Sequence, residues 1–296
     1  MNAEDHSDEE ILRVVNNVDK ELLLGGMDIK LRYWEVPRVA MQRLGHVPYA
    51  GEPAILQRIE AAFNSIYRKE DIAIGGHIGV FMYRDIFARI AVPALVFGEV
   101  AINPFEYVKL TPVQLGIIQT EPEEMEKFLD QFADVWDIQY CGHGLKLQYR
   151  EIELVKRYIG LARLHLHAAA AIVTGGYDYR GAVQSSLLAN ELSLKACVAA
   201  HEVCEKCIKR FGHDTGKLLK FIKVRWPTFD SERAGRVLQA NPNYVLNRYS
   251  EIQPSRREVG TIVMGAQYVV SEAIRLLSED NFRSNVNWTR IRVYPE

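Results

Sequence analysis

The sequence predicts an α+β protein, with a small β-sheet domain and flanking helices over residues 1–140 and an up-and-down helical bundle over residues 145–280. In residues 71–118, short runs of Val, Ile, Phe and Tyr alternate with Pro and Gly breakers, which is typical of strands. After Cys141-Gly-His-Gly144, apolar residues recur every three or four positions, which is typical of amphipathic helices. We therefore place the domain boundary at residues 141–144.

Length and composition agree with this division. The chain has 296 residues, of which 48% are hydrophobic and 25% charged, and this suits one large or two ordinary soluble domains. No apolar run reaches the roughly 18 residues that cross a bilayer, and the acidic N-terminus lacks the pattern of a secretory signal. Four cysteines are too few for a disulfide scaffold. We expect a cytoplasmic protein with no membrane partner.

The elements of the first domain follow from local signals. In chain order they are a helix from residue 7 or 8 to 24, an extended segment at 31–36, a helix at 53–68, short strands within 72–118, and a helix at 120–136. Thr120 is the expected N-cap of the last helix, with Glu123 at the capping-box position. The acidic face of this helix, which includes Asp130, Asp134 and Asp137, is expected to face solvent.

The second domain is expected to be helical almost throughout. Its helices are placed at 147–174, 180–210, 214–225, 231–239 and 255–277, the last with a capping box from Ser255 to Glu258. The helix at 180–210 carries apolar residues on two sides, which predicts the central position in the bundle. Glu191 falls inside one of these stripes, and Lys195, one turn later, is its expected partner. Residues 281–296 form an extension, in which 288–294 alternate like a strand that returns to the sheet.

Three short motifs follow one another in the second domain. They read Ala189-Asn-Glu-Leu-Ser-Leu-Lys-Ala196, Gly212-His-Asp-Thr-Gly-Lys-Leu-Leu219, and Asn247-Arg-Tyr-Ser250 before the last long helix. This order resembles HEPN domains, a superfamily of helical bundles, over about residues 150–280. Residues 1–140 resemble no family that we can name.

The resemblance implies a face-to-face homodimer that binds or acts on RNA or a nucleotide, often in a bacterial toxin–antitoxin or antiviral defence system. Active members resemble ribonucleases in which an Arg and a His, separated by about four to six residues, steady the phosphate and move a proton. No Arg and His of this chain have that spacing. The leading hypothesis is therefore an RNA- or nucleotide-binding protein without that nuclease motif.

Two alternatives stay open. One is a divergent, metal-independent endoribonuclease that uses Arg210 and His213 from two protomers. The other is a non-enzymatic structural or interaction protein, in which residues 1–140 bind another protein. An RNA binder is distinguished from the latter by an affinity that falls steeply with salt.

Charge is distributed unevenly along the chain. The net charge is −2, but residues 1–150 hold 15 Lys and Arg against 23 Asp and Glu, whereas residues 151–296 hold 21 against 15. The strongest basic stretch is Lys206, Lys209, Arg210, Lys217, Lys220, Lys223 and Arg225. Arg248 precedes the last helix, where it is expected to reach the groove beside Glu191. The expected ligand contacts are Glu191, Lys195, Arg210, His213, Lys217, Lys220 and Arg248.

One cluster carries zinc-type ligands at close spacing: His201, Cys204, Cys207 and His213. On a continuous helix these side chains fall on successive turns, whereas structural zinc sites usually place a Cys pair on a tight knuckle. We therefore expect partly buried bundle cysteines, with no metal and no cofactor.

Overall fold

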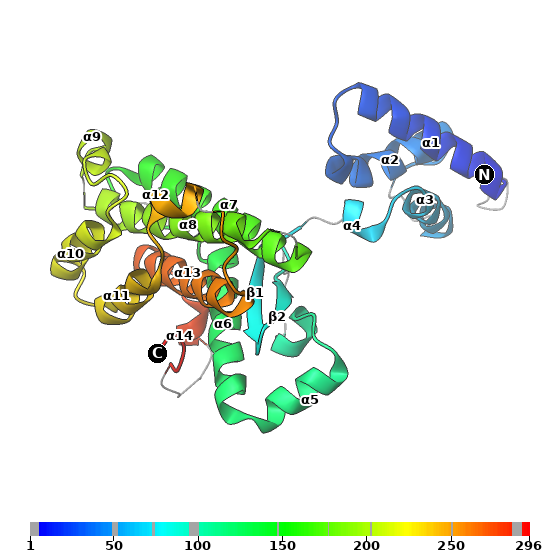
Figure 1. Ribbon diagram of the computed structural model, residues 1–296. Coiled ribbons are helices and arrows are strands. Elements are labelled where there is room, and N and C mark those ends of the chain that lie inside the picture. The colour runs from blue at the N-terminus through cyan, green and yellow to red at the C-terminus, as the bar shows by residue number, and fades with distance from the viewer. Residues whose placement is uncertain are drawn as a thin grey trace. The chain divides into compact units, whose positions relative to one another are not determined.

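The computed structural model describes residues 6–48, 53–72, 75–94, 101–146, 148–176, 178–201, 203–249, 251–285 and 292–296. The chain divides into two compact units, Met1–Gly75 and Gly76–Glu296 (Figure 1). Most described residues are helical, and one two-stranded sheet accompanies them, so the layout is α+β. The units meet at Gly75 and Gly76, whereas the sequence predicted a boundary at residues 141–144.

The smaller unit consists of α1 (Asp8–Leu24), α2 (Ile29–Arg43), α3 (Pro53–Ile66) and the short α4 (Lys69–Ile72). Ile11 and Val15 of α1, Val36 of α2, and Ile59 and Phe63 of α3 are buried in one core. The expected extended segment at 31–36 was wrong, because these residues belong to α2. Asp28 caps that helix, and its buried positions recur at helical spacing despite an internal proline.

The sheet belongs to the larger unit. Strands β1 (Ile78–Tyr83) and β2 (Ile86–Ala91) pair antiparallel, with Ile78 opposite Ala91 and Tyr83 opposite Ile86. All six residues of β1 are buried, because the strand packs against three bundle helices, which are α6 (Pro122–Tyr140), α7 (Ile152–Gly175) and α13 (Arg256–Leu277). Gln267 of α13 fastens the strand: its Oε1 accepts from the Val80 N–H at 2.7 Å, and its Nε2 donates to the Val80 carbonyl at 2.9 Å. This shared core explains why no boundary falls at residues 141–144.

The sheet is smaller than the sequence predicted. Residues 113–118, expected as a strand, lie in helix α5 (Pro112–Thr120), which Thr111 and Gln114 start with a capping box. Beyond β2, Val108 forms only an isolated bridge with Ile90 after the 3₁₀ turn η1 (Pro104–Tyr107). Residues 94–102, which belong to the segment where short strands were expected, lie largely outside the described residues.

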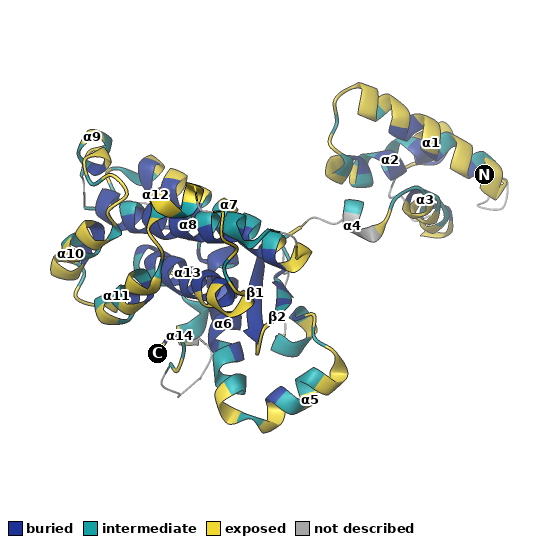
Figure 2. Ribbon diagram, viewed as in Figure 1, coloured by how far each residue is buried: buried dark blue, intermediate teal, exposed yellow. Residues whose placement is uncertain are grey.

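The bundle is built around α8. Its helices are α6 (Pro122–Tyr140), α7 (Ile152–Gly175), α8 (Tyr179–Ala199), α9 (Glu205–Lys209), α10 (Thr215–Arg225), α11 (Ser231–Ala240), α12 (Tyr244–Tyr249), α13 (Arg256–Leu277) and α14 (Phe282–Asn285). Helix α8 contacts α7, α13, α10 and α12 and is buried along most of its length (Figure 2). The predicted central helix is confirmed, as is the capping box that begins α13 at Ser255. A HEPN-like identity for the bundle stays a prediction.

The expected helix at 180–210 is interrupted after Ala199. In a continued helix the Cys197 carbonyl would accept from the N–H of residue 201. Instead it accepts from the indole Nε1–H of Trp226 at 3.3 Å, and the His201 N–H turns back to the Val198 carbonyl at 3.1 Å. Cys207 consequently lies on the separate short helix α9, and Cys204 is the N-cap residue of that helix.

The end of the chain returns to the bundle without forming a strand within residues 292–296. The backbone N–H groups of Val293 and Tyr294 donate to the Asp130 carboxylate of α6 at 2.9 and 3.0 Å. The remainder of the expected strand at 288–294 lies outside the described residues. None of the described helices combines the length and apolar character needed to span a bilayer.

Candidate functional site

The buried carboxylate of Glu191 joins α8 to the segment before α10. Its side chain is only 4% exposed. Lys195 donates to one carboxylate oxygen at 2.5 Å, and Nδ1 of His213 lies 2.7 Å from the other. The ion pair predicted between Glu191 and Lys195 is present, and His213 is an additional partner. Because a carboxylate oxygen accepts hydrogen bonds, Nδ1 of His213 is the donor in this contact, and Nε2 takes no part in it.

His213 is held in place but remains accessible. Its ring stacks on Tyr244 of α12, with centroids 4.6 Å apart and planes 20° apart. Its side chain is 56% exposed, and Nε2 has no hydrogen-bond partner among the described residues. Gly212, with a φ of +59°, provides the left-handed turn that brings His213 back to α8. An oriented imidazole with one exposed nitrogen is suited to accept a proton or a ligand hydrogen bond.

A cavity of about 440 Å³ opens beside this pair. It is lined by α8, the segment before α10 and the connection from α11 to α12, with Asn190, Glu191, His213 and Tyr244 among the lining residues. Asn190 is fully buried, and among the residues that the structure describes neither the oxygen nor the nitrogen of its amide has a hydrogen-bond partner. Buried polar groups are nearly always paired, so an unpaired amide at a cavity is an observation that points to a ligand. Sequence analysis missed Asn190, because its surroundings in α8 do not distinguish it from a structural residue.

The remaining expected contacts lie around this cavity rather than in it. Arg248 does not line it: the guanidinium donates to the Tyr244 hydroxyl at 2.7 Å and lies 5.0 Å from the Tyr244 ring centre. Lys217 is exposed and forms an ion pair with Asp214 at 3.1 Å. Arg210 and Lys220 are exposed and form no ion pair within the described residues. Tyr244 therefore connects Arg248 to the site indirectly.

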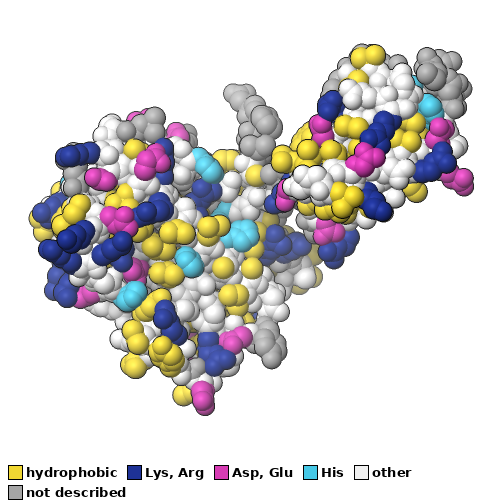
Figure 3. Space-filling model, turned by 90° about the horizontal axis from the view of Figure 1, so that it is seen from above, with side chains coloured by type: hydrophobic (Ala, Val, Ile, Leu, Met, Phe, Trp, Pro, Cys, Tyr) yellow, Lys and Arg dark blue, Asp and Glu magenta, His cyan; other side chains and the backbone are white. Residues whose placement is uncertain are grey.

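An exposed basic surface extends from α9 along α10, and we call it the α9–α10 surface. Lys and Arg side chains gather on that side of the larger unit (Figure 3). Its members are Lys206, Lys209, Arg210, Lys217, Lys220, Lys223 and Arg225. Within the described residues only Lys209 and Lys217 are in ion pairs, with Glu205 and Asp214. The guanidinium of Arg225 lies 3.9 Å from the centre of the Phe221 ring, so Phe221 is already occupied on one face.

The four zinc-type ligands are not brought together. His213 is bound to Glu191, and His201 packs edge-on against Trp226, with ring centroids 4.6 Å apart. Only Cys204 and Cys207 are neighbours. Within the described ranges, no group of three or more His, Cys, Asp or Glu side chains is arranged to hold a metal ion.

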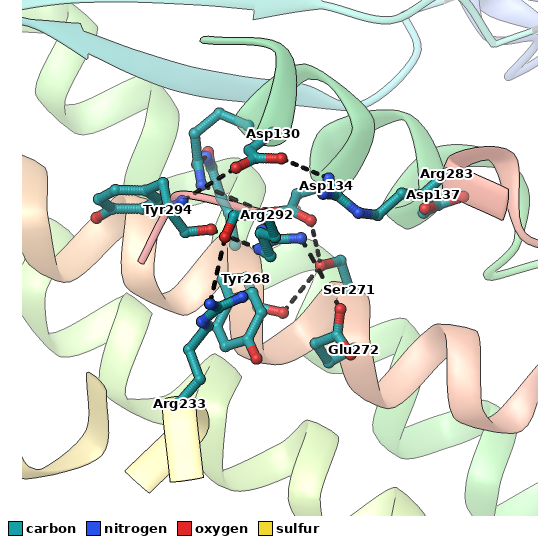
Figure 4. A network of polar contacts seen from close by, with 12 residues as sticks. Asp130, Asp134, Asp137, Arg233, Tyr268, Ser271, Glu272, Arg283, Arg292 and Tyr294 are labelled. Carbon is teal, nitrogen blue, oxygen red and sulfur yellow. Dashed lines mark hydrogen bonds and ion pairs between the residues drawn. The ribbon is translucent and has the colours of Figure 1, made fainter. Parts of the chain in front are cut away.

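A second cluster of charges lies on α6 (Figure 4). Asp130, Asp134 and Asp137 are at most 1% exposed, so the expectation of a solvated face was wrong for these three residues. Arg275 of α13 donates to both Asp134 and Asp137, at 2.8 and 2.6 Å. The sequence shows the acidic stripe, but the arginines that cover it lie more than a hundred residues later.

Each of the six carboxylate oxygens in this cluster accepts at least one hydrogen bond. Arg283 binds Asp130 at 2.6 Å, Ser271 binds Asp134 at 2.8 Å, and Arg292 also binds Asp134. Burial alone raises the pKa of Asp134, but the charges of Arg292 and Arg275 outweigh it and hold that pKa below the usual value. With every oxygen occupied from within the chain, the cluster is structural and fastens residues 292–296 and α13 to α6.

Comparison with known proteins found no match, either to protein-family models or to curated proteins and solved structures. The interpretation of the site therefore rests on its own geometry.

Proposed function

We propose that the larger unit binds RNA or a nucleotide, with a base in the cavity at Asn190 and phosphates on the α9–α10 surface. The observation that carries this proposal is that one cavity is lined both by His213 and by Asn190, whose buried amide has no hydrogen-bond partner among the described residues. An amide presents one acceptor next to one donor, and the Watson–Crick edge of every nucleobase offers a complementary donor and acceptor. The His213–Tyr244 stack adds an aromatic surface of the kind on which unstacked bases pack.

The exposed cations support the phosphate half of the proposal. Arg210 lies three residues before His213, and Lys220 and Lys223 follow along α10. Because these side chains are exposed and unpaired within the described residues, phosphate binding would release counterions without first breaking internal ion pairs. The resemblance to HEPN domains supports the same ligand class, and it adds the homodimer and the defence or toxin–antitoxin setting as further parts of the proposal.

Fluorescence anisotropy with a labelled single-stranded RNA of about 12 nucleotides tests the proposal. We expect binding at low salt, with an affinity that falls linearly on a log–log scale by about 0.7 per phosphate contact. Lys220→Glu/Lys223→Glu should lower this slope by about 1.4. Lys109→Glu/Lys156→Glu is the matched control, because it changes the same charge at exposed lysines on other elements of the same unit. Absence of binding to any RNA or nucleotide at low salt would overturn the proposal. An equal loss of RNA affinity in the two double variants would also overturn it.

A second candidate function, metal-independent RNA cleavage, is favoured by one observation. Glu191 fixes the tautomer of His213, which leaves Nε2 as a base able to take the proton of a ribose 2′-hydroxyl, with Arg210 as the proposed phosphate contact. We expect His213→Ala to abolish cleavage of labelled RNA in the presence of a chelator. Cleavage by this variant at the wild-type rate would exclude the role.

The dimeric form of this candidate has its own test. If Arg210 and His213 of one site come from two protomers, neither Arg210→Ala nor His213→Ala cleaves alone. A mixed dimer of the two variants contains one intact site, so an equal mixture should recover about a quarter of the wild-type activity. Two inactive variants that stay inactive after mixing under subunit exchange would place the residues in one protomer.

A further inference from the structure

The sequence Cys204-Glu-Lys-Cys207 places two thiols side by side at the start of the short helix α9, where Cys204 is the N-cap residue. The Sγ atoms are 3.0 Å apart; Cys204 is exposed and Cys207 is half-buried. The backbone holds this spacing, because the N–H groups of Cys207 and Ile208 both donate to the Cys204 carbonyl, at 2.9 and 3.0 Å. The two sulfurs therefore face each other across one turn.

This turn is anchored to the rest of the bundle. Ile208 is fully buried in the main core. Glu205, between the two cysteines, forms ion pairs with Arg157 of α7 at 2.8 Å and with Lys209 at 3.0 Å. Because the backbone is fixed at these points, the sulfurs need to approach by only about 1 Å to reach the disulfide bond length of roughly 2.05 Å.

The two thiols differ in reactivity. The pKa of Cys204 lies below the ordinary thiol value, first because of its hydrogen bond with the Cys207 side chain, and further because of backbone N–H groups and the charge of Arg210. The pKa of Cys207 is raised, first because of the same hydrogen bond with the Cys204 side chain. Cys204 is therefore the better supplied with thiolate, which is the attacking form.

Two other cysteines provide an internal contrast. Cys141 and Cys197 are 2% and 0% exposed, and burial raises the pKa of each. A thiol that is both buried and protonated is unreactive towards a dissolved oxidant. Any oxidation of this chain by a small disulfide should therefore be confined to Cys204 and Cys207.

We propose that Cys204 and Cys207 form a dithiol–disulfide redox site that exchanges with a small aliphatic disulfide of the glutathione class. The Cys204 thiolate attacks one sulfur of the disulfide, and one glutathione thiolate leaves. The Cys207 thiolate then attacks the Cys204 sulfur and displaces the second glutathione. The two cysteines lose two electrons and two protons in total, and the small disulfide gains them as two thiols.

The test uses the full chain, reduced, freed of reductant and equilibrated without oxygen in glutathione buffers of different oxidation. Free thiols are blocked with N-ethylmaleimide, and the products are identified by intact mass and peptide mapping. We expect a single internal disulfide between Cys204 and Cys207, with Cys141 and Cys197 reduced throughout. Cys207→Ser should stop at a mixed disulfide on Cys204, whereas Cys204→Ser should react about tenfold more slowly.

Two outcomes would overturn the proposal. The first is four free thiols in every buffer, including the most oxidising. The second is glutathione adducts on wild-type Cys204 or Cys207 without an internal disulfide, which would show that the turn does not close. Circular dichroism of both serine variants distinguishes a chemical effect from unfolding, and wild-type peptide mapping decides the question without either variant.

Discussion

The buried carboxylates at Asp134 and at Glu191 both lie on bundle helices, but they differ in whether unpaired polar groups lie nearby. At Asp134 the cluster lies between α6 and α13, and each carboxylate oxygen is bound from within the chain. At Glu191 both oxygens are also occupied, but the site keeps an exposed His213 and an unpaired Asn190 amide at a cavity. Burial of charge is therefore not itself a sign of function. The unpaired polar groups beside it are the more informative feature.

The largest expected effect is on stability at Asp134. Asp134→Ala leaves Arg275 and Arg292 without this shared carboxylate, and breaking a buried ion pair typically costs about 3–5 kcal/mol. Urea unfolding followed by circular dichroism measures the loss. The exposed Asp85→Ala is the control and should stay within about 0.5 kcal/mol of wild type. A loss at Asp134 no larger than at Asp85 would show that the cluster is not structural.

The next largest effect concerns the buried imidazole of His77, whose Nε2 has no hydrogen-bond partner among the described residues. Burial, together with the charges of Arg163 and His167, lowers the pKa of His77 from 6.5 to about 3. Between pH 6.5 and about pH 3 the His77 side chain is therefore protonated in the unfolded chain but neutral in the folded chain. The free energy of unfolding consequently decreases as the pH falls from 6.5 towards 3.

At about pH 5, unfolding of wild type should be about 2 kcal/mol easier on account of His77 than at neutral pH. His77→Gln removes this contribution, and unfolding curves over a pH series measure the difference. If the unfolding free energies of wild type and variant changed with pH in the same way, the role of His77 would be refuted. Acid titration of Asp134 also destabilises the fold, but it acts in both proteins and cancels in the comparison.

A stability effect of similar size is expected at Glu191. Glu191→Gln keeps the size and one acceptor but removes the charge that pairs with Lys195 and His213, at a cost of about 2 kcal/mol in unfolding free energy. Nucleotide affinity, measured by calorimetry, should fall by at least about tenfold if His213 loses its orientation. An unchanged affinity would separate Glu191 from the binding site and leave it a purely structural residue.

The smallest effect on stability is expected at Asn190, the unpaired group that distinguishes the Glu191 site from the Asp134 cluster. Asn190→Leu replaces an unpaired buried amide with an apolar side chain of similar size, so the unfolding free energy should be unchanged or higher by up to about 1 kcal/mol. Ligand affinity should be lost, because the donor and acceptor are gone. Loss of stability by this variant would mean that the amide has an internal partner, and the argument for a ligand at the cavity would fail.

The sequence alone determined the elements whose signals are local. The central position of α8 follows from its two apolar stripes, the pairing of Glu191 with Lys195 from helical spacing, and the start of α13 from the Ser255 capping box. Each of these depends on residues within one or two helical turns, where periodicity and capping are sufficient.

Tertiary structure decided everything that depends on distant partners. The acidic residues of α6 are buried because arginines from the last quarter of the chain reach them, and the sheet joins the bundle because Gln267 binds β1. Trp226 donates to the Cys197 carbonyl where α8 ends, and Cys204 and Cys207 meet in the separate turn that follows. The cavity at Asn190 also requires three segments to converge. Burial and hydrogen-bond satisfaction are properties of the packed chain, and no local pattern encodes them.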